Sequence, residues 1–316
     1  MGHFYYIYYF MHIPVLLNEV IAAANPTSTC HVLDCTFGRG GYSKAFLEAG
    51  CHVTALDRDD TACIYADDLL KQFPNHFTFI QEKFSNISKI FQPQAFDIVV
   101  FDIGVSSPQL DNAERGFSFN KSGPLDMRMG SSDLTAADIV NTYEERQMML
   151  LFFNYGEEKR SRKYAKLICE QRLIKPFETT NELADLIKDN TPKFFNKKKK
   201  IHPATLVFQA LRIAVNDELN EFETALNQCH HLLKPNGRLV TVSFHSLEDR
   251  IAKNYFKAHS FEPKQSKYAK EKIIADNLYQ LITKKPVTAS PEEIKSNPRS
   301  SCAKLRAAIR TQIPII

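Results

Sequence analysis

Glycines and carboxylates follow two apolar runs near the amino end of the chain, in a pattern suited to a nucleoside. The stretch HVLDCTFGRGGYSKAF (31–46) carries Asp34 and then glycines at 38, 40 and 41. Glycines in such a turn let the backbone approach a ligand closely. The next apolar run, CHVTALD (51–57), ends in Asp57, where a carboxylate can accept both hydroxyls of a ribose.

The turn lacks the usual means of holding phosphate. It does not contain the GxGxxG fingerprint of dinucleotide sites, and no GK[ST] of a P-loop follows. A ribose carboxylate without a phosphate site indicates a nucleoside that lacks pyrophosphate, and we predict S-adenosylmethionine. Its sulfonium would be favoured near carboxylates such as Asp34. The alternative is an ordinary tight strand-to-helix turn with a structural aspartate.

A second polar set follows the apolar run FDIVVFDIG (96–104), which contains Asp102 and leads into SSPQ (106–109). Methyltransferases that modify exocyclic amines carry a short polar segment with proline at this place. Its oxygens can hold the amine so that the lone pair faces the methyl group. We therefore predict Asp102, Ser106 and Ser107 as catalytic groups. A Ser/Pro surface turn is the alternative.

Strand and helix patterns alternate through the first hundred residues and again after residue 236. This alternation predicts a parallel, doubly wound, Rossmann-like α/β sheet with right-handed crossovers. A closing hairpin would be formed by the last two strands. The predicted strands are 31–37, 51–57, 76–84, 96–104, 237–244, 281–288 and 302–310, and the predicted helices of this part are 42–49, 60–72 and 246–259.

About 130 residues between the fourth and fifth strands do not alternate, and their apolar spacing is helical. We expect helices near 133–154, 157–173 and 179–190, and one long amphipathic helix from about 203, with Gly237 marking its exit. The chain therefore divides into a sheet domain of residues 12–107 and 203–316, a helical insertion domain of residues 108–202, and an N-terminal extension of residues 1–11.

The composition limits the possible partners and sites but does not identify the function. The formal net charge of the 316 residues is +4, so a basic surface would have to be local. Apolar runs fall short of the roughly 20 residues of a membrane span, and no membrane partner is expected. Seven scattered cysteines without a CxxC pair predict free thiols in a reducing cytoplasm and no metal site.

Several blocks of the chain resemble one family. They are HIPVLLNEV, DCTFGRGGYS, ALDRD, FDIGVSSPQLDNAERGFSFNKSGPLDMRM, HPATLVFQALRIAVNDEL and GRLVTVSFHSLEDR. They are similar to the bacterial ribosomal RNA small-subunit methyltransferase H family, also called MraW, from about residue 12 to 250. The resemblance implies a class I S-adenosylmethionine methyltransferase with a helical insertion. It also implies N4-methylation of one cytidine in the decoding region of small-subunit (16S) ribosomal RNA.

The resemblance implies roles for single residues as well. The family usually has histidine where this chain has Tyr42, a change that is harmless if the contact is made by the backbone N–H. The implied cofactor-binding residues are Gly40, Gly41, Tyr42, Asp57, Phe84, Asp102 and Gln109.

Aromatic and basic residues are candidates for holding the RNA. Phe117 and Phe119 could stack on a base and Arg115 could meet a phosphate, although core packing of the phenylalanines is the alternative. His245 could bind RNA or take up a proton, or it could simply cap a strand end. The run Lys197–Lys200 could bind RNA or be a solvated face.

The predicted partner is the small-subunit ribosomal RNA or the assembled small subunit, and a homodimer is left open. Two other functions stay open from the residues. One is a methyltransferase of the same fold that acts on another amine, in DNA or a small molecule. The other is a non-catalytic RNA-binding assembly module, against which the intact glycines and Asp57 argue.

Overall fold

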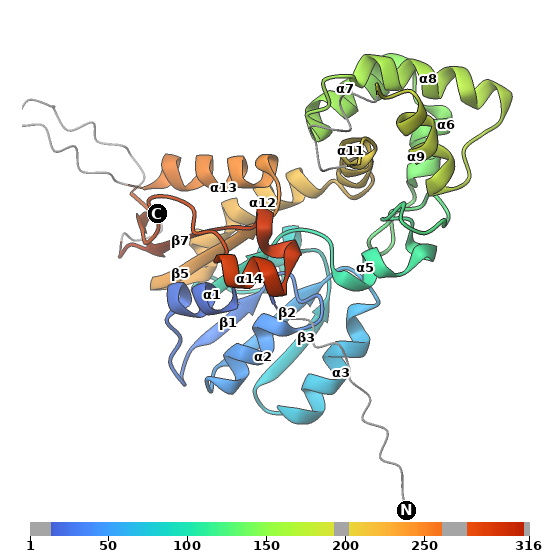
Figure 1. Ribbon diagram of the computed structural model, residues 1–316. Helices are drawn as coiled ribbons and strands as arrows, with labels where there is room; N and C mark the ends of the chain where they lie inside the picture. Colours follow the sequence, from blue (N-terminus) through green and yellow to red (C-terminus); the bar gives the residue numbers. More distant parts are fainter. Residues whose placement is uncertain (1–13, 193–201, 261–276, 313–316) are drawn as a thin grey trace, which may run out of the picture. The chain divides into compact units, whose positions relative to one another are not determined.

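The computed structural model describes residues 14–192, 202–260 and 277–312. The chain forms two compact units, Met1–Gly104 with Phe222–Ile316, and Val105–Glu221 (Figure 1). The predicted extension 1–11 and the run Lys197–Lys200 lie outside the described residues. None of the helices in the described ranges is long and apolar enough to span a membrane.

A seven-stranded sheet forms the centre of the first unit, in the order β3-β2-β1-β4-β5-β7-β6. The first five strands are parallel, and β7 runs antiparallel to both β5 and β6. Strand order reverses between β1 and β4, as in doubly wound folds, so the predicted fold class is confirmed. The strands are β1 (His31–Asp34), β2 (His52–Asp57), β3 (Phe77–Gln81), β4 (Phe96–Asp102), β5 (Leu233–Ser243), β6 (Tyr279–Leu281) and β7 (Lys304–Arg310).

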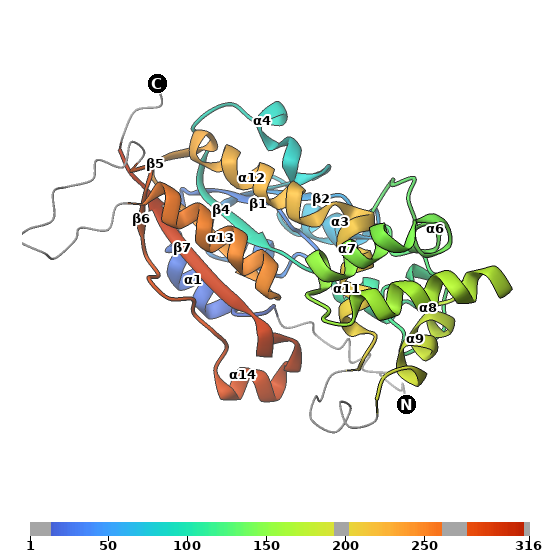
Figure 2. The ribbon, with the colours of Figure 1, turned by 90° about the horizontal axis from the view of Figure 1, so that it is seen from above.

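Helices cover both faces of this sheet because alternate strand residues are apolar on both sides. Val32 and Val53 pack into one core, and Leu33 and Leu56 into the core of the opposite face. Figure 2 shows α12 and α13 along one side of the sheet and α1 along the other. The helices are α1 (Leu17–Ala24), α2 (Gly41–Glu48), α3 (Ala62–Gln72), η1 (Phe84–Asn86), α4 (Ile87–Ile90), α12 (Glu218–Leu232), α13 (Ser246–His259), α14 (Pro291–Ser296) and η3 (Pro298–Cys302).

The second unit is helical and packs around a single apolar core. Local hydrogen bonds set where its helices begin. The hydroxyl of Thr135 accepts from the Asp138 N–H, and that of Thr179 accepts from the Glu182 N–H, each within a capping box. The helices are α5 (Ser107–Asp111), η2 (Ala113–Arg115), α6 (Ala136–Thr142), α7 (Glu145–Gly156), α8 (Ser161–Ile174), α9 (Thr180–Asp189) and α11 (Thr205–Asn216).

The prediction of one long helix from about residue 203 is wrong, because two helices, α11 and α12, cover this stretch. α11 ends at Asn216, Asp217 adopts a left-handed φ of 51°, and α12 begins at Glu218. The Arg212 guanidinium bridges this break with two hydrogen bonds to the Glu218 carboxylate, at 2.8 and 2.7 Å. The apolar periodicity continues across the break, so the period alone does not reveal it.

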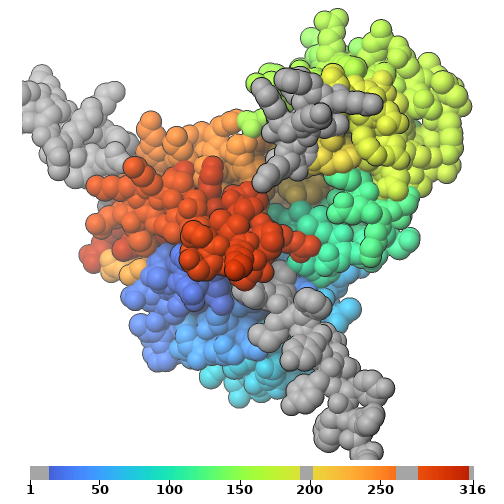
Figure 3. Space-filling view, viewed as in Figure 1, coloured from blue at the N-terminus to red at the C-terminus, as the bar shows by residue number. Residues whose placement is uncertain are grey.

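The boundaries differ from those predicted in three further places. The helical unit runs from Val105 to Glu221, beyond the predicted 108–202, because α11 packs its apolar face into that unit's core. Gly237 lies inside β5 rather than at a helix exit. The two late strands do pair antiparallel, but β6 is short and α14 separates it from β7. In the space-filling view the red residues around α14 lie against the blue residues around α1 (Figure 3).

A close helix contact inside the second unit yields a first prediction. A Cβ on Gly156 of α7 would lie 2.5 Å from the carbonyl oxygen of Leu206 in α11. Gly156→Ala should therefore force the helices apart and destabilise the unit by about 1–3 kcal/mol. The melting temperature followed by circular dichroism should fall. Asn154→Ala, at an exposed position of the same helix, is the control. Equal melting temperatures for the two variants would contradict this packing.

Candidate active site at one edge of the sheet

The glycine-rich turn between β1 and α2 contains three glycines with different surroundings. Gly38 and Gly40 have left-handed φ values of 55° and 75°. A Cβ on Gly40 would lie 2.7 Å from the Phe37 ring, and one on Gly41 would lie 2.3 Å from Cγ of Pro14. Among the described residues, the atom nearest to a Cβ built on Gly38 is the Thr36 carbonyl oxygen, at 4.0 Å. Internal packing therefore requires Gly40 and Gly41, whereas Gly38 leaves open space for a ligand.

Asp57 lies at the end of β2 and is held by two backbone donors. One carboxylate oxygen accepts from the Gly38 N–H at 2.8 Å, and the other accepts from the Asp59 N–H at 2.9 Å. Burial raises the pKa of Asp57 to about 6. Each oxygen can accept a further hydrogen bond. The carboxylate is thus fixed beside the glycine-rich turn with capacity for the two hydroxyls of a ribose.

Asp34 lies at the end of β1 and is buried. Its carboxylate accepts from the Ser43 hydroxyl at 2.7 Å and from the Thr36 N–H at 3.2 Å. The Thr36 hydroxyl in turn accepts from the Asp102 N–H at 2.6 Å. Burial raises the pKa of Asp34 to about 6. These contacts tie the ends of β1 and β4 to the first turn of α2.

Asp102 lies at the end of β4, and its Oδ1 is buried without a hydrogen-bond partner among the described residues. Burial, and then the charges of Asp34 and Glu248, raise its pKa to about 8. An unpartnered carboxyl oxygen in negative surroundings favours a ligand that brings positive charge. The sulfonium of S-adenosylmethionine has that charge, so the residues present fit this cofactor.

Phe84 and Tyr42 flank the same edge from other elements. Phe84 follows β3 in η1 and packs edge-on against Phe101, with ring centroids 5.8 Å apart. Its contact with adenine stays a prediction. The Tyr42 side chain is buried, and its hydroxyl donates to the carbonyl of Val15. With the side chain engaged inside the protein, the backbone N–H of Tyr42 is the group left for a cofactor.

His245 is the N-cap of α13, and both of its ring nitrogens face Glu248. Nδ1 accepts from the Glu248 N–H at 3.4 Å, and Nε2 lies 2.9 Å from Glu248 Oε1. These contacts correspond to the alternative of a structural histidine at the strand end, where His245 caps α13. The effect of Glu248 on the pKa of Asp102 was not predicted from the sequence. The H-x-x-E spacing of residues 245–248 indicates a capping box, and this is the local signal that involves Glu248.

The SSPQ segment begins α5 in the second unit. The Ser106 N–H donates to Gln109 Oε1 at 2.8 Å in a capping box, and Ser107 and Gln109 are buried. The Gln109 side chain therefore fixes the start of its own helix. The predicted roles of Ser106, Ser107 and Gln109 toward the amine and the cofactor stay predictions.

The predicted RNA-stacking residues are largely packed inside the second unit. Phe117 is buried in its core, and the Arg115 guanidinium lies 5.6 Å from the centre of that ring. Phe119 is half-buried against Phe208. For Phe117 the contacts correspond to the packing alternative.

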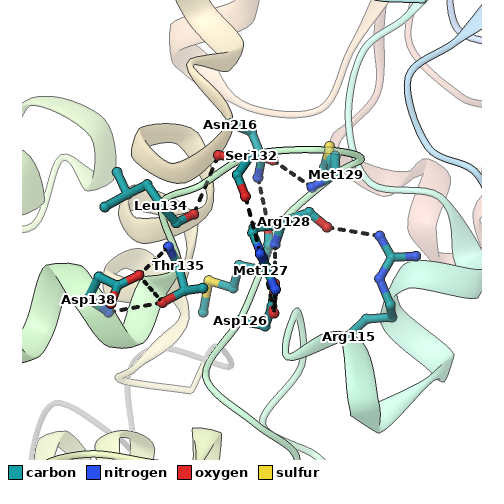
Figure 4. A network of polar contacts seen from close by, with 10 residues as sticks. All are labelled: Arg115, Asp126, Met127, Arg128, Met129, Ser132, Leu134, Thr135, Asp138 and Asn216. Carbon is teal, nitrogen blue, oxygen red and sulfur yellow. Dashed lines mark hydrogen bonds and ion pairs between the residues drawn. The ribbon is translucent and has the colours of Figure 1, made fainter.

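Polar contacts order the loop that follows these residues (Figure 4). Arg115 donates to the Arg128 carbonyl at 2.9 Å, and the Arg128 guanidinium pairs with the Asp126 carboxylate, at 2.7 Å for the closest pair of atoms. The Asn216 side chain donates to the Met127 carbonyl and accepts from the Met129 N–H. The Arg128 charge is therefore paired with Asp126, and the Arg115 guanidinium is held by the Arg128 carbonyl.

A family model described as the MraW methylase family matches residues 9–311. The chain belongs to this family. It is 48% identical over 303 residues to ribosomal RNA small subunit methyltransferase H of Sinorhizobium medicae, covering 96% of this chain and 88% of the relative. It is 46% identical over 301 residues to the protein of that name from Rickettsia massiliae, covering 94% and 97%.

Among solved structures, the N-methyltransferase NodS of Bradyrhizobium japonicum in complex with S-adenosylhomocysteine resembles the chain at 8% identity. The TM-score is 0.41, and the match covers 93% of this chain and 85% of that one. Membership of the MraW methylase family confirms the resemblance noted from the sequence and the prediction of S-adenosylmethionine as cofactor.

In this MraW family member, Gly38 should be the glycine on which the cofactor depends most directly. Gly38→Ala strains a left-handed residue and places a methyl group in the open space, so we expect affinity for S-adenosylmethionine to fall about tenfold or more. Gly50→Ala is the matched control, because Gly50 also has a left-handed φ, 86°, but lies beyond α2. It should lower thermal stability and leave the dissociation constant unchanged in calorimetry. Equal affinity losses would contradict the assignment.

The raised pKa of Asp102 predicts pH-dependent binding of a cation. A carboxyl with a pKa of about 8 ionises as the pH rises toward that value, and only the ionised form attracts a sulfonium. Affinity for S-adenosylmethionine should therefore rise between pH 6 and 8, by up to about tenfold per pH unit. Affinity for S-adenosylhomocysteine, whose sulfur is neutral, should change less. The ratio of the two dissociation constants isolates this effect, and it should become independent of pH in Asp102→Asn.

Proposed function

We propose that this protein transfers the methyl group of S-adenosylmethionine to N4 of one cytidine in the decoding region of 16S ribosomal RNA. One observation of the structure carries the proposal: Oδ1 of Asp102 is buried without a hydrogen-bond partner among the described residues, and Asp102 lies four residues before Ser106 of the SSPQ segment. The curated relatives, named ribosomal RNA small subunit methyltransferase H, support small-subunit ribosomal RNA as the substrate. The chemistry of that segment supports an exocyclic amine as the acceptor, and N4 of a decoding-region cytidine is what the family resemblance implies.

The exocyclic amine of cytosine is a poor nucleophile because its lone pair is delocalised into the ring. Catalysis then depends mostly on position and electrostatics. When bound, the cofactor supplies an electrophilic methyl group on a positively charged sulfur. The Asp102 carboxylate can accept an N–H of the amine, which localises the lone pair, and can stabilise the positive charge that develops on the nitrogen. Ser106 and Ser107 would orient the amine through hydroxyl and carbonyl oxygens.

The cofactor contacts that we propose follow the edge of the sheet. Asp57 would hold the ribose, Phe84 the adenine, and Asp102 the sulfonium side of the methionine part. The backbone of residues 38–42 would lie against that methionine part. The Gly38 N–H donates to Asp57 at 2.8 Å, so this turn begins next to the proposed ribose site. Gln109 would act by fixing the start of α5.

Reaching a base requires it to leave its stack. We propose that the helical unit Val105–Glu221 recognises the RNA, because it follows Asp102 directly in the chain. Arg115 and the half-buried Phe119 are its candidate contacts. Phe117 would support them from the core.

The decisive experiment is transfer of a labelled methyl group to two substrates from a strain that lacks the enzyme: assembled small subunits and free 16S ribosomal RNA. Nuclease digestion and mass spectrometry should locate N4-methylcytidine at one decoding-region position in at least one of them. Label in DNA or in a small amine instead would favour the alternative substrates. Cofactor binding without transfer to any of these would favour a non-catalytic assembly protein.

Asp102→Asn tests the catalytic role. It keeps the size and one acceptor but removes the charge, so single-turnover methylation at saturating cofactor should slow by on the order of 10²-fold or more. The dissociation constant for S-adenosylhomocysteine should change much less. A near-normal rate would leave Ser106, Ser107 and the nearby backbone as the groups that orient the amine.

A further inference from the structure

A short segment ahead of α1 lies directly against the glycine-rich turn. We propose that residues Pro14–Leu16, here called the strap, position this turn for the cofactor, and that Tyr42 and Glu293 hold the strap in place. The inference rests on the use of S-adenosylmethionine and is independent of the RNA target. Tyr42 and Glu293 are therefore positioning residues, acting through the turn.

The strap accounts for one of the glycines. A Cβ on Gly41 would lie 2.3 Å from Cγ and 3.1 Å from Cβ of Pro14, so the proline ring occupies the space that any other residue would need. The adjacent Tyr42 is buried, and its hydroxyl donates to the Val15 carbonyl. Consecutive residues at the start of α2 thus contact consecutive residues of the strap.

The other end of the strap is held from a distant part of the chain. The Leu16 N–H donates to Glu293 Oε1 at 2.7 Å, across 277 residues of sequence. Leu16 has a left-handed φ of 53°, a strained conformation for a branched side chain. It is also the N-cap of α1, where no side chain of its own caps the helix. A carboxylate at this position both stabilises the helix dipole and fixes the strained residue.

The Glu293 side chain bonds to the strap and not to the N-cap of its own helix. It is the third residue of α14, and its N–H donates to the Ser290 hydroxyl at 3.1 Å. A glutamate at this position commonly bonds back to the N-cap N–H. Here one carboxylate oxygen reaches the strap instead. The C-terminal segment that carries α14 lies over the N-terminal residues in Figure 3.

The strap connects to the carboxylates of the site through α2. Ser43, next to Tyr42, donates to Asp34 at 2.7 Å. Asp34 also accepts from the N–H of Thr36, whose hydroxyl accepts from the Asp102 N–H at 2.6 Å. Burial, and then the charges of Asp102 and Asp34, raise the pKa of Tyr42 well above its usual range. Loosening the strap should therefore disturb the turn and the Asp34 side chain together.

Calorimetry of S-adenosylmethionine binding to the full chain, without RNA, tests the proposal alongside hydrogen exchange of the turn. Tyr42→Phe removes only the hydroxyl, and Glu293→Ala removes the acceptor. Each should weaken binding by about 3- to 30-fold and speed amide exchange over residues 38–44. Glu293→Gln keeps an acceptor oxygen and should retain affinity. Glu292→Ala, at the exposed neighbouring position, should change neither quantity.

Three further results separate positioning from general stability. Single-turnover methylation at saturating cofactor should be nearly normal in Glu293→Ala, whereas KM for the cofactor rises. The double variant should lose less affinity than the two single losses combined, because both act on one strap. If the variants lower the melting temperature but leave the dissociation constant and the exchange of the turn unchanged, the strap is only structural and the proposal is overturned. Should Tyr42→Phe fail to fold, the contrast between Glu293→Ala and Glu293→Gln decides.

Discussion

Negative charge gathered at one edge of a parallel sheet is the constraint on which the rest of this structure depends. Parallel strands bring their carboxyl ends together, so Asp34, Asp57 and Asp102 are all desolvated at the same edge. Their pKa values are raised, and the folded protein therefore holds protons that an unfolded chain would release. For Asp102 this means that stability is lost as the pH rises from its ordinary value of 3.8 toward about 8. A bound cation offsets that cost, which links the unfavourable electrostatics of the edge to the ligand it accepts.

The same edge needs a backbone that approaches the ligand without adding charge. The turn after β1 does this with a few hydrogen bonds between distant positions. Gly38 donates to Asp57, and Thr36 accepts from Asp102. The three strand ends are thus held by one short loop, and a change in that loop reaches every carboxylate. Residues far from the ligand, such as Pro14, become part of the same arrangement because they press on the loop.

Local patterns predicted the strand ends well, because alternation and a terminal aspartate are properties of short stretches of sequence. Asp57 lies at the strand end expected for it, whereas Asp34 and Asp102 end β1 and β4 about three and two residues before the predicted ends at 37 and 104. Contacts between distant segments could not be predicted in this way. The reason for Gly41 lies in Pro14, and the acceptor of the Leu16 N–H lies in Glu293. Phe117 shows the same limit, since nothing local distinguishes a stacking ring from one buried in the core of the helical unit. The left-handed Asp217 interrupts an apolar period that continues on both sides of it.

The sheet holds the first residues after β4, which lead into the SSPQ segment that we propose binds the substrate. After Asp102, the Ile103 N–H still donates to Val242 of β5 at 2.9 Å, so the chain leaves the sheet only after this bond. Gly104 then adopts a φ of 150°, and a Cβ there would lie 3.1 Å from the Phe244 ring. The end of β5 therefore contacts the chain at the end of β4, from Asp102 to Gly104. Phe244 is followed by the helix cap that His245 and Glu248 form. The end of β5 therefore supports both this cap and the residues after β4 that lead to Ser106.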